Sequence, residues 1–599
     1  MRNASLVLLL LVASVLSAAE APRDIVFRNA RVFDGARVIE ADVLVRGDRI
    51  ADVGKTLSAP EGAMVVDGRG KTLMPGLIDS HIHAFGNALE QALIFGVTTE
   101  LDMFTDAGMA RSMREQQAAG GASGRADLFS AGTLVTAPGG HGTQYGIPIP
   151  TIAAPEQAQE FVDARIAEGS DWIKIVYDDG SAYGMSTPTV SEKTMRAVIA
   201  AAHARKKLAV VHIGTLAAAR QAIDAGADAI VHLFIDRAPD AEFGTFVAGR
   251  GAFVIPTLVV LKSVTGSAGG ESLAGDAAIA PYLDAGARAI LQQAFPRRKD
   301  RPQVSYAAAE ATVRQLAAAN VPILAGSDAP NPGTAHGAAL HRELELLVAA
   351  GLTPLQALTA ATSAPAKAFR LDDRGRIAKG LRADLLLVEG DPTRDITATR
   401  RIAGIWKGGV AVDRASWAKT IAASREAAER TPEGLETGTL SDFEAGSPVA
   451  AFGTTWMPSA DDIAGGKSTG KIEVVDGGAA DSAKSLSVTG TISSALPYAW
   501  FGAMWSPNAT PMTPANLSSK KGIRFQARGD GKSYRMMVFA QSKGMMPLVK
   551  NFTAGAEWQL VEVAWKDLGI DGSDVMAVIF SGGPEPGEFA FQIDEVALP

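Results

Sequence analysis

The sequence has 599 residues, which is too long for one hydrophobic core, so two or three domains are expected. Hydrophobic residues make up 47% and charged residues 20%, the composition of an ordinary globular protein. The net charge of −8, without a basic block, argues against nucleic acid or an anionic membrane surface as a partner. Because cysteine is absent, disulfides, thiolate metal sites and a cysteine nucleophile are excluded.

The N-terminus has the pattern of an export signal. Arg2 precedes an apolar run at residues 6–16, and the small residues 17–19 follow it. This layout predicts a secretory signal peptide over residues 1–19. A membrane anchor is the alternative, but the apolar run is short for about 30 Å of hydrocarbon. We therefore expect a periplasmic or secreted protein without a stable membrane anchor.

Short strands are expected on both sides of a longer central region. Residues 24–70 alternate apolar and polar side chains and are divided by turn signals, which predicts antiparallel strands. Similar alternation returns at residues 375–388 and 401–412. We expect the two flanks, residues 24–74 and 375–415, to form one small β-sandwich.

The central region, residues 75–374, alternates strand-like and helix-like patterns, which is typical of parallel β/α units. One strand-like segment ends at His83, and seven others follow it at residues 97–103, 127–132, 172–177, 208–212, 229–233, 252–258 and 322–327. Eight strands over about 250 residues predict an α/β fold of the TIM (β/α)8 barrel type. A Gly/Ser-rich piece at residues 263–275 could be a lid or a disordered loop.

The composition changes after the barrel. Residues 416–439 predict a helix and a linker, and residues 440–599 contain short strands separated by Gly, Pro, Asn and Asp clusters. No helix is evident there, which predicts a separate all-β jelly-roll domain. Trp456, Trp500 and Trp505 could stack on sugars if they are exposed, although tryptophan in a sandwich is more often part of the core.

A pair of histidines ends the first barrel strand. The segment is LMPGLIDSHIH, which places His81 and His83 two residues apart. Residues i and i+2 of a strand point to the same side, so both imidazoles enter one space. Neutral imidazoles bind divalent metals well, but the H-x-H pattern alone is a weak signal.

Further candidate ligands occur at other strand ends. His212 closes the fifth strand-like segment, His232 closes the sixth, and Asp328 follows the eighth. The active sites of TIM barrels assemble at the C-terminal ends of the strands. A single histidine of this kind is more often a packed or surface residue. Their joint placement is poorly explained by chance, since the chain has only 8 histidines.

Lys174 lies within an apolar strand, DWIKIVY, where a lone buried ammonium is costly. One interpretation is a salt bridge to a neighbouring acid. The other is carbamylation by carbon dioxide, which would create a carboxylate able to bridge two cations.

These residues resemble the motifs of the amidohydrolase superfamily. The resemblance covers residues 24–415 and rests on PGLIDSHIH, the strand residue Lys174, His212, His232, GSDAP and HRELELLVAAGLTPLQALTAATSAPAKAF. It is strongest with the prolidase-like and imidazolonepropionase-like branch of binuclear members. The resemblance implies a metal-dependent hydrolase with a β/α barrel and a small flanking β-sandwich.

The same resemblance implies a ligand set and a mechanism. One metal would be held by His81, His83 and Asp328, the other by His212 and His232, and carbamylated Lys174 would bridge them. Zinc is the usual occupant, although nitrogen and oxygen donors alone do not exclude manganese, iron or cobalt. Two such ions bring the pKa of a bridging water toward about 7. The resulting hydroxide would attack a carbonyl, with Asp328 as general base and acid.

Three residues are candidates for substrate contact. His141 lies in APGGHGTQYG, and similar GGHG segments occur in the prolidase-like branch; a loop histidine without a role is the alternative. Tyr145 and Tyr177 are the other two candidates. The expected activity is hydrolysis of a carbon–nitrogen bond in a small amide, dipeptide-like or acylated amino acid compound. The same site could instead hydrolyse a lactone or phosphotriester.

The C-terminal domain resembles the complex I intermediate-associated protein family, which is related to galactose-binding jelly rolls. The matching segments are DDIAGGKSTG, KKGIRFQARGDGKSYRMMV and FAFQIDEVAL. This resemblance implies a possible carbohydrate or protein partner for that domain. A non-catalytic glycan-binding protein is therefore the alternative from another functional class. The oligomeric state is left open by the sequence.

Overall fold

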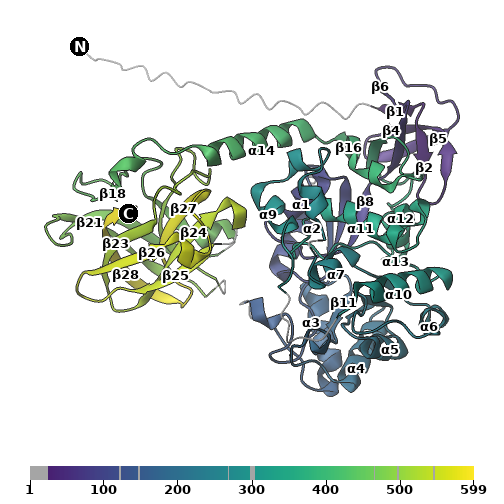
Figure 1. Cartoon of the computed structure of the whole chain (residues 1–599), viewed down its shortest axis with the longest axis horizontal. Helices are drawn as coiled ribbons and strands as arrows, with labels where there is room; N and C mark the ends of the chain where they lie inside the picture. Colours follow the sequence, from purple (N-terminus) through teal and green to yellow (C-terminus); the bar gives the residue numbers. More distant parts are fainter. Residues whose placement is uncertain are drawn as a thin grey trace, which may run out of the picture.

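The computed structural model describes residues 24–119, 123–145, 149–267, 269–296, 304–464, 466–494, 498–543 and 547–599. The predicted signal peptide therefore lies outside the described residues. Figure 1 shows a β/α barrel on the right, flanking strands in purple at its upper edge and an all-β domain on the left. Helix α14 (Arg414–Glu429) runs between them. No helix within the described ranges is long and apolar enough to cross a membrane.

The barrel strands pair in parallel as two groups. The first group is β8 (Leu77–Ile82), β9 (Val97–Asp102) and β10 (Asp127–Ser130), and the second is β11 (Ile173–Val176), β12 (Ala209–His212), β13 (Ala229–Val231) and β14 (Phe253–Ile255). A parallel bridge between Val135 and Ile175 closes one seam. Residues 322–329 close the other seam through bridges to β14 and β8. The predicted barrel is confirmed, with an irregular eighth strand.

The irregular eighth strand packs very closely against its neighbours. A Cβ atom added to Gly326 would lie 2.6 Å from Ile255 Cγ2 and 2.9 Å from His81 Cβ. The Asp79 carboxylate on β8 accepts hydrogen bonds from the backbone N–H groups of Ser327 (2.9 Å) and His81 (3.1 Å). A side chain thus replaces part of the strand ladder and fixes the segment that leads to Asp328.

Helices surround the barrel, and most of them contribute buried side chains to one large apolar core that they share with the strands. They are α1 (Ala88–Ile94), α2 (Ala107–Ala118), α3 (Ala158–Glu168), α4 (Glu192–Ala204), α5 (Leu216–Asp224), α6 (Phe243–Arg250), α7 (Leu258–Val264), α8 (Glu271–Ala274), α9 (Ala285–Leu291), α10 (Tyr306–Ala318), α11 (Ala338–Ala349), α12 (Pro354–Ala360) and α13 (Ser363–Ala368). Side-chain caps fix several helix starts; Ser191 accepts from Thr194 N and Thr215 from Ala218 N. The Gly/Ser-rich piece at 263–275 contains the end of α7 and all of α8.

Two sheets flank the barrel. One has the order β5-β4-β1-β6, and the other has the order β17-β16-β15-β7-β2-β3 and so takes strands from both ends of the barrel region. Their bounds are β1 (Ile25–Arg28), β2 (Arg31–Phe33), β3 (Val38–Glu40), β4 (Asp42–Arg46), β5 (Arg49–Gly54), β6 (Met64–Asp67), β7 (Lys71–Pro75), β15 (Leu385–Glu389), β16 (Ile402–Lys407) and β17 (Val410–Ala411). The expectation of antiparallel pairing within residues 24–70 is wrong for β1–β6, which is parallel; β2 also pairs in parallel with β7, just beyond that range. Neither pair is joined by a hairpin, so no turn sets its direction.

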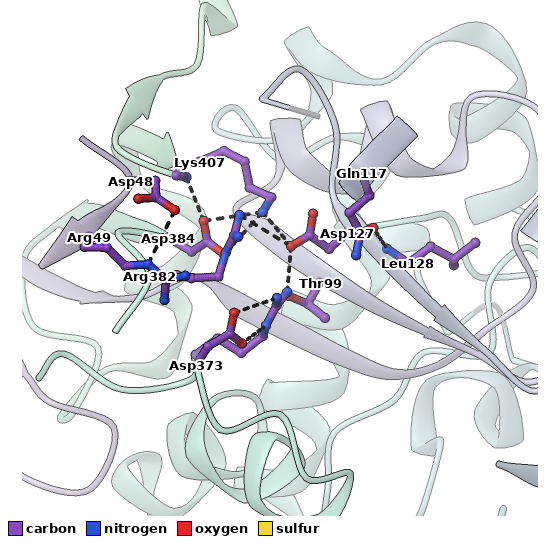
Figure 2. A network of polar contacts seen from close by, with 12 residues as sticks. Asp48, Arg49, Thr99, Gln117, Asp127, Leu128, Asp373, Arg382, Asp384 and Lys407 are labelled. Atoms are coloured by element: carbon purple, nitrogen blue, oxygen red, sulfur yellow. Dashed lines mark hydrogen bonds and ion pairs between the residues drawn. The ribbon is translucent and has the colours of Figure 1, made fainter. Parts of the chain in front are cut away.

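A buried ionic network joins the flanking strands to the barrel (Figure 2). Lys407 Nζ on β16 lies 2.8 Å from Asp127 Oδ2 on β10 and 3.2 Å from Asp384 Oδ2. Arg374 donates to the same Asp127 oxygen at 2.6 Å. Each of these four side chains is buried, so the charges are compensated by one another rather than by water.

The C-terminal domain consists of two packed sheets with antiparallel pairing. Its strands are β18 (Thr439–Ser441), β19 (Met457–Ala460), β20 (Thr469–Asp476), β21 (Lys484–Ile492), β22 (Phe501–Trp505), β23 (Gly522–Gly529), β24 (Ser533–Ala540), β25 (Leu548–Thr553), β26 (Gln559–Ala564), β27 (Val575–Gly582) and β28 (Gly587–Ala597). Helical structure in its described residues is limited to short 3-10 turns.

The possibility that exposed tryptophans of this domain stack on sugars is wrong for two of the three residues. Trp456 and Trp505 are 2% and 0% exposed and belong to the core between the two sheets. Their indole N–H groups donate to Ser441 Oγ and to the Phe452 carbonyl. They are buried because large aromatic rings fill the space between the packed sheets. Trp500 is only partly buried.

Candidate metal centre

The six predicted ligands line one cavity of about 370 Å³ at the C-terminal end of the barrel strands. His81 belongs to β8 and His83 follows it, Lys174 belongs to β11, His212 ends β12, His232 follows β13, and Asp328 follows the irregular eighth strand. Parallel strands end on the same side of a barrel, so residues far apart in sequence meet there.

The distances among these side chains are short. His83 Nε2 and His81 Nε2 lie 3.2 Å and 3.4 Å from Asp328 Oδ1. The ring centre of His232 lies 4.8 Å from that of His81 and 4.5 Å from that of His212. One possible ligand atom from each of His81, His232 and Asp328 lies within 4.8 Å of the others.

Three residues around the cavity adopt left-handed backbone conformations. The φ angles are 66° at His232, 50° at Thr257 and 55° at Asp328. This conformation is unfavourable for residues other than glycine and persists where the surroundings impose it, often at functional sites. In each case the residue lies just beyond a strand; His232 and Asp328 line the cavity, and Thr257 contacts His232.

Neighbouring groups fix the orientation of two histidines. The Nδ1–H of His83 donates to the Phe104 carbonyl at 3.1 Å, and His232 Nδ1 lies 2.7 Å from Thr257 Oγ1. In both rings Nε2 is left for the cavity. His336 Nε2 lies 3.0 Å from the His83 carbonyl oxygen and forms a hydrogen bond with the backbone at His83. No sequence motif pointed to Thr257.

Lys174 is 2% exposed, and its Nζ has no hydrogen-bonding partner among the described residues. Burial lowers the pKa of this amine to about 7, against the opposing influence of Asp328 and Asp102. The salt bridge left open by the sequence is not formed within the described part of the chain. An amine that is neutral near pH 7 is the form that can react with carbon dioxide.

Three more buried acids lie close to the ligands. Burial raises the pKa of Asp79 to about 7 and that of Asp102 to about 6, and it also raises the pKa of Glu100. Asp102 accepts hydrogen bonds from Ala84 N (2.9 Å) and Ser130 Oγ (2.5 Å). Burial therefore favours the neutral forms of these acids. The sequence did not single them out as functional residues.

The three candidate substrate contacts differ in position. His141 lines the cavity, with its ring centre 5.3 Å from that of His212, and burial lowers its pKa to about 3. Tyr177 does not line the cavity, because strand alternation turns it away from Lys174 and its hydroxyl donates to Gln221 Oε1 at 2.9 Å. Tyr183 lines the cavity instead. The side chain of Tyr145 lies outside the described part.

The remaining wall of the cavity is largely apolar. Its apolar residues are Leu134, Val176, Met185, Val260, Leu261, Val264, Phe295, Pro296 and Val304. Among the described lining residues, Lys174 has the only lysine or arginine side chain. Asp178 is an additional carboxylate, with its Oδ2 3.3 Å from His212 Nε2.

The donor set fits divalent metal ions. Imidazole nitrogens and carboxylate oxygens suit zinc, manganese, iron and cobalt, and the buried Lys174 amine can supply a carboxylate after carbamylation. Among the described residues that line the cavity, Met185 supplies the only sulfur atom, a thioether. The residues present are therefore compatible with the metal centre that the sequence predicts.

Comparison with known proteins supports the same relationship. Residues 72–412 match the amidohydrolase family, and residues 442–571 match Complex I intermediate-associated protein 30. The chain is 28% identical to imidazolonepropionase of Anaeromyxobacter dehalogenans over 405 residues, which are 61% of this chain and 89% of that protein.

Solved structures share the barrel fold. A Xaa-Pro dipeptidase with bound methionine superimposes with a TM-score of 0.52 at 23% identity, covering 65% of this chain and 99% of that one. Phenylurea hydrolase B gives a TM-score of 0.51 at 23% identity, covering 66% and 97% of the two chains.

Proposed function

The chain belongs to the amidohydrolase family, and we propose that it is an exported, metal-dependent enzyme that hydrolyses an amide in a small, largely apolar molecule. Its class, a hydrolase acting on carbon–nitrogen bonds, follows from the family and its relatives. The observation that carries the proposal is the convergence of four histidines, Lys174 and Asp328 in one cavity. Export rests on the signal-peptide pattern of residues 1–19.

We further propose that this cavity binds two divalent ions, with zinc as the first candidate. His81, His83 and Asp328 would hold one ion and His212 and His232 the other, with carbamylated Lys174 between them. Bound divalent ions would polarise the scissile carbonyl and lower the pKa of a water nucleophile.

The chain's own residues supply the proton transfers and the substrate contacts. Asp328 lies at the cavity edge, where its carboxylate can take a proton from the attacking water and return it to the leaving nitrogen. His141, which lines the same cavity, would donate a hydrogen bond to the carbonyl oxygen of the substrate. The overall reaction consumes one amide and one water and yields a carboxylic acid and an amine.

The apolar wall limits the substrate. Val260, Leu261 and Val264 present one side of α7 to the cavity, where a ring or an aliphatic group would be desolvated. Dipeptide-like compounds with an apolar ring meet this requirement. The similar proteins define the first compounds to screen, namely an imidazolone, an Xaa-Pro dipeptide and a phenylurea.

Metal content is the first test. The full chain is purified with bicarbonate and metal per chain is measured for wild type, Lys174→Ala and the surface control Lys193→Ala. We expect about two equivalents in wild type and in the control, and one or none in Lys174→Ala, because the bridging group is lost. A wild type that binds no metal after reconstitution would contradict the proposal.

Turnover is the second test. Asp328→Asn keeps an oxygen ligand but cannot accept the proton, so kcat should fall by about 10²-fold or more while at least one metal equivalent remains. Asp372→Asn, on the exposed surface, serves as the control and should leave kcat unchanged. If lactones or phosphotriesters are hydrolysed and amides are not, the amide assignment is wrong.

A further inference from the structure

Asp178 is a buried carboxylate at the cavity that has no role in the reaction outlined above. It follows β11, and its side chain is 8% exposed. Its Oδ2 atom lies 3.3 Å from Nε2 of His212, the histidine that ends β12. It belongs to none of the ligand positions that the family resemblance implies.

The backbone holds this carboxylate in one position. Gly180 N–H donates to Asp178 Oδ1 at 3.0 Å, and Asp178 N–H donates to Thr189 Oγ1 at 3.1 Å. The carboxylate also packs on Gly214, where an added Cβ would lie 2.7 Å from Asp178 Oδ1. Gly214 lies two residues after His212, so the same loop carries the histidine and makes room for its partner.

His212 is oriented differently from the other supported histidines. His83 and His232 are each held through Nδ1, by the Phe104 carbonyl and by Thr257 Oγ1, and so offer Nε2 to the cavity. His212 is held through Nε2 instead. A carboxylate can only accept a hydrogen bond, so His212 carries its proton on Nε2 and keeps the Nδ1 lone pair for a metal.

Histidines that bind metals commonly donate their other N–H to a carboxylate, which fixes the tautomer and the ring orientation. Both Asp178 oxygens already have partners in the protein, Gly180 N–H for Oδ1 and His212 for Oδ2. These two contacts hold the carboxylate against the His212 ring.

We propose that Asp178 is a positioning residue that holds His212 with Nδ1 directed at the metal centre. The inference rests on the metal centre of the proposed function, but not on the identity of the substrate. It predicts that replacing Asp178 weakens the binding of one of the two metal ions.

The test compares Asp178→Asn with Asp179→Asn in the full chain. Asp179 is the adjacent, exposed aspartate, and it contacts Ser181 N rather than a histidine. Each apo protein is titrated with Zn²⁺ against a competing chelator, and Co²⁺-loaded samples are compared by visible absorption. We expect Asp178→Asn to bind one equivalent about 10- to 100-fold more weakly and to shift the Co²⁺ spectrum. Asp179→Asn should match wild type in both measurements.

Gly214→Ala provides a second variant that leaves every charge in place. The new methyl group would displace the Asp178 carboxylate, so metal affinity should fall in the same direction. Thermal unfolding of the apo proteins verifies that each variant is folded.

Unchanged metal affinity and spectrum in Asp178→Asn would overturn the proposal, and a raised KM alone would assign Asp178 to the substrate instead. If the metal effects are found and no amide is hydrolysed, the proposed function fails while the role of Asp178 stands.

Discussion

Glu343 shows how one buried side chain supports the wall of the cavity. This residue of α11 is fully buried, and its Oε2 accepts a hydrogen bond from Val259 N–H at 2.8 Å. Val259 belongs to α7, whose next residues, Val260 and Leu261, line the cavity. Burial raises the pKa of Glu343 to about 8, so the neutral acid is the stable form in the folded protein at pH 7.

Glu343 should therefore make stability depend on pH. The ordinary pKa of 4.5 applies to the unfolded chain, so between about pH 4.5 and 8 the folded state binds a proton that the unfolded state has lost. Stability from this group is complete below about pH 4.5 and falls by up to about 1.4 kcal/mol per pH unit as the pH rises toward 8. Glu343→Gln should remove this fall, measured by urea unfolding from pH 5 to 8.

The exposed residue Glu271 provides the control, since Glu271→Gln should keep the wild-type pH dependence. Parallel stability curves for wild type and Glu343→Gln would show that Glu343 does not titrate in this range.

Strands β10 and β16 meet through charges rather than through a continuous sheet. Lys407 on β16 lies between Asp127 on β10 and Asp384 in the segment before β15, and it is 2% exposed. Coulombic attraction to Lys407 and Arg374 outweighs burial and lowers the pKa of Asp127. Asp127 is therefore held in its ionised form, and its ion pairs join the flanking strands to the barrel.

Replacing Lys407, the central cation of this network, should lower the free energy of unfolding. Lys407→Met removes the most deeply buried cation of the network and leaves Asp127 and Asp384 with only the arginines Arg374 and Arg382, so the free energy of unfolding should fall by up to about 3–5 kcal/mol. Lys471→Met removes an exposed lysine from a surface pair with Glu473 and should change stability by less than about 1 kcal/mol. The free energy of unfolding of both variants is measured with urea. If Lys407→Met lowers it no more than Lys471→Met does, the buried ion pairs of Lys407 contribute little to stability.

The molecule contains separate apolar cores. One large cluster surrounds the barrel strands, and another fills the space between the two C-terminal sheets. Helix α14 links them, and the polar contacts across this region include Asn516 N–H with the Arg430 carbonyl (3.0 Å) and Gln541 with Ser424. Such a connection is limited compared with either core, so the two parts should unfold as distinct units.

Calorimetry of the full chain should show two transitions. Removal of metal by a chelator should lower only the barrel transition, because an ion that binds the native barrel stabilises that unit alone. Trp505→Ala should lower only the other transition, with a loss of about 3–5 kcal/mol for deleting a fully buried aromatic side chain. A single transition that shifts in both experiments would show one cooperative unit.

Sequence patterns determined the barrel, the all-β C-terminal domain and the strand ends that carry the candidate ligands. Period-2 and helical periodicity identify parallel β/α units, and the barrel then places all strand ends on one face. His81, His83, His212, His232 and Asp328 follow from that logic, and Lys174 is visible as a charge in an apolar strand.

Only the tertiary structure decided which neighbours these residues meet. Asp178 with His212, Thr257 with His232 and Glu343 with α7 are pairs separated by 34, 25 and 84 residues, and no periodic pattern links them. Tyr183, in the short turn Ser181–Tyr183 after β11, lines the cavity in place of Tyr177. Trp456 and Trp505 are core residues because two sheets close on them. Local periodicity reports which side a residue faces, whereas the partner it finds there is set by how distant segments pack.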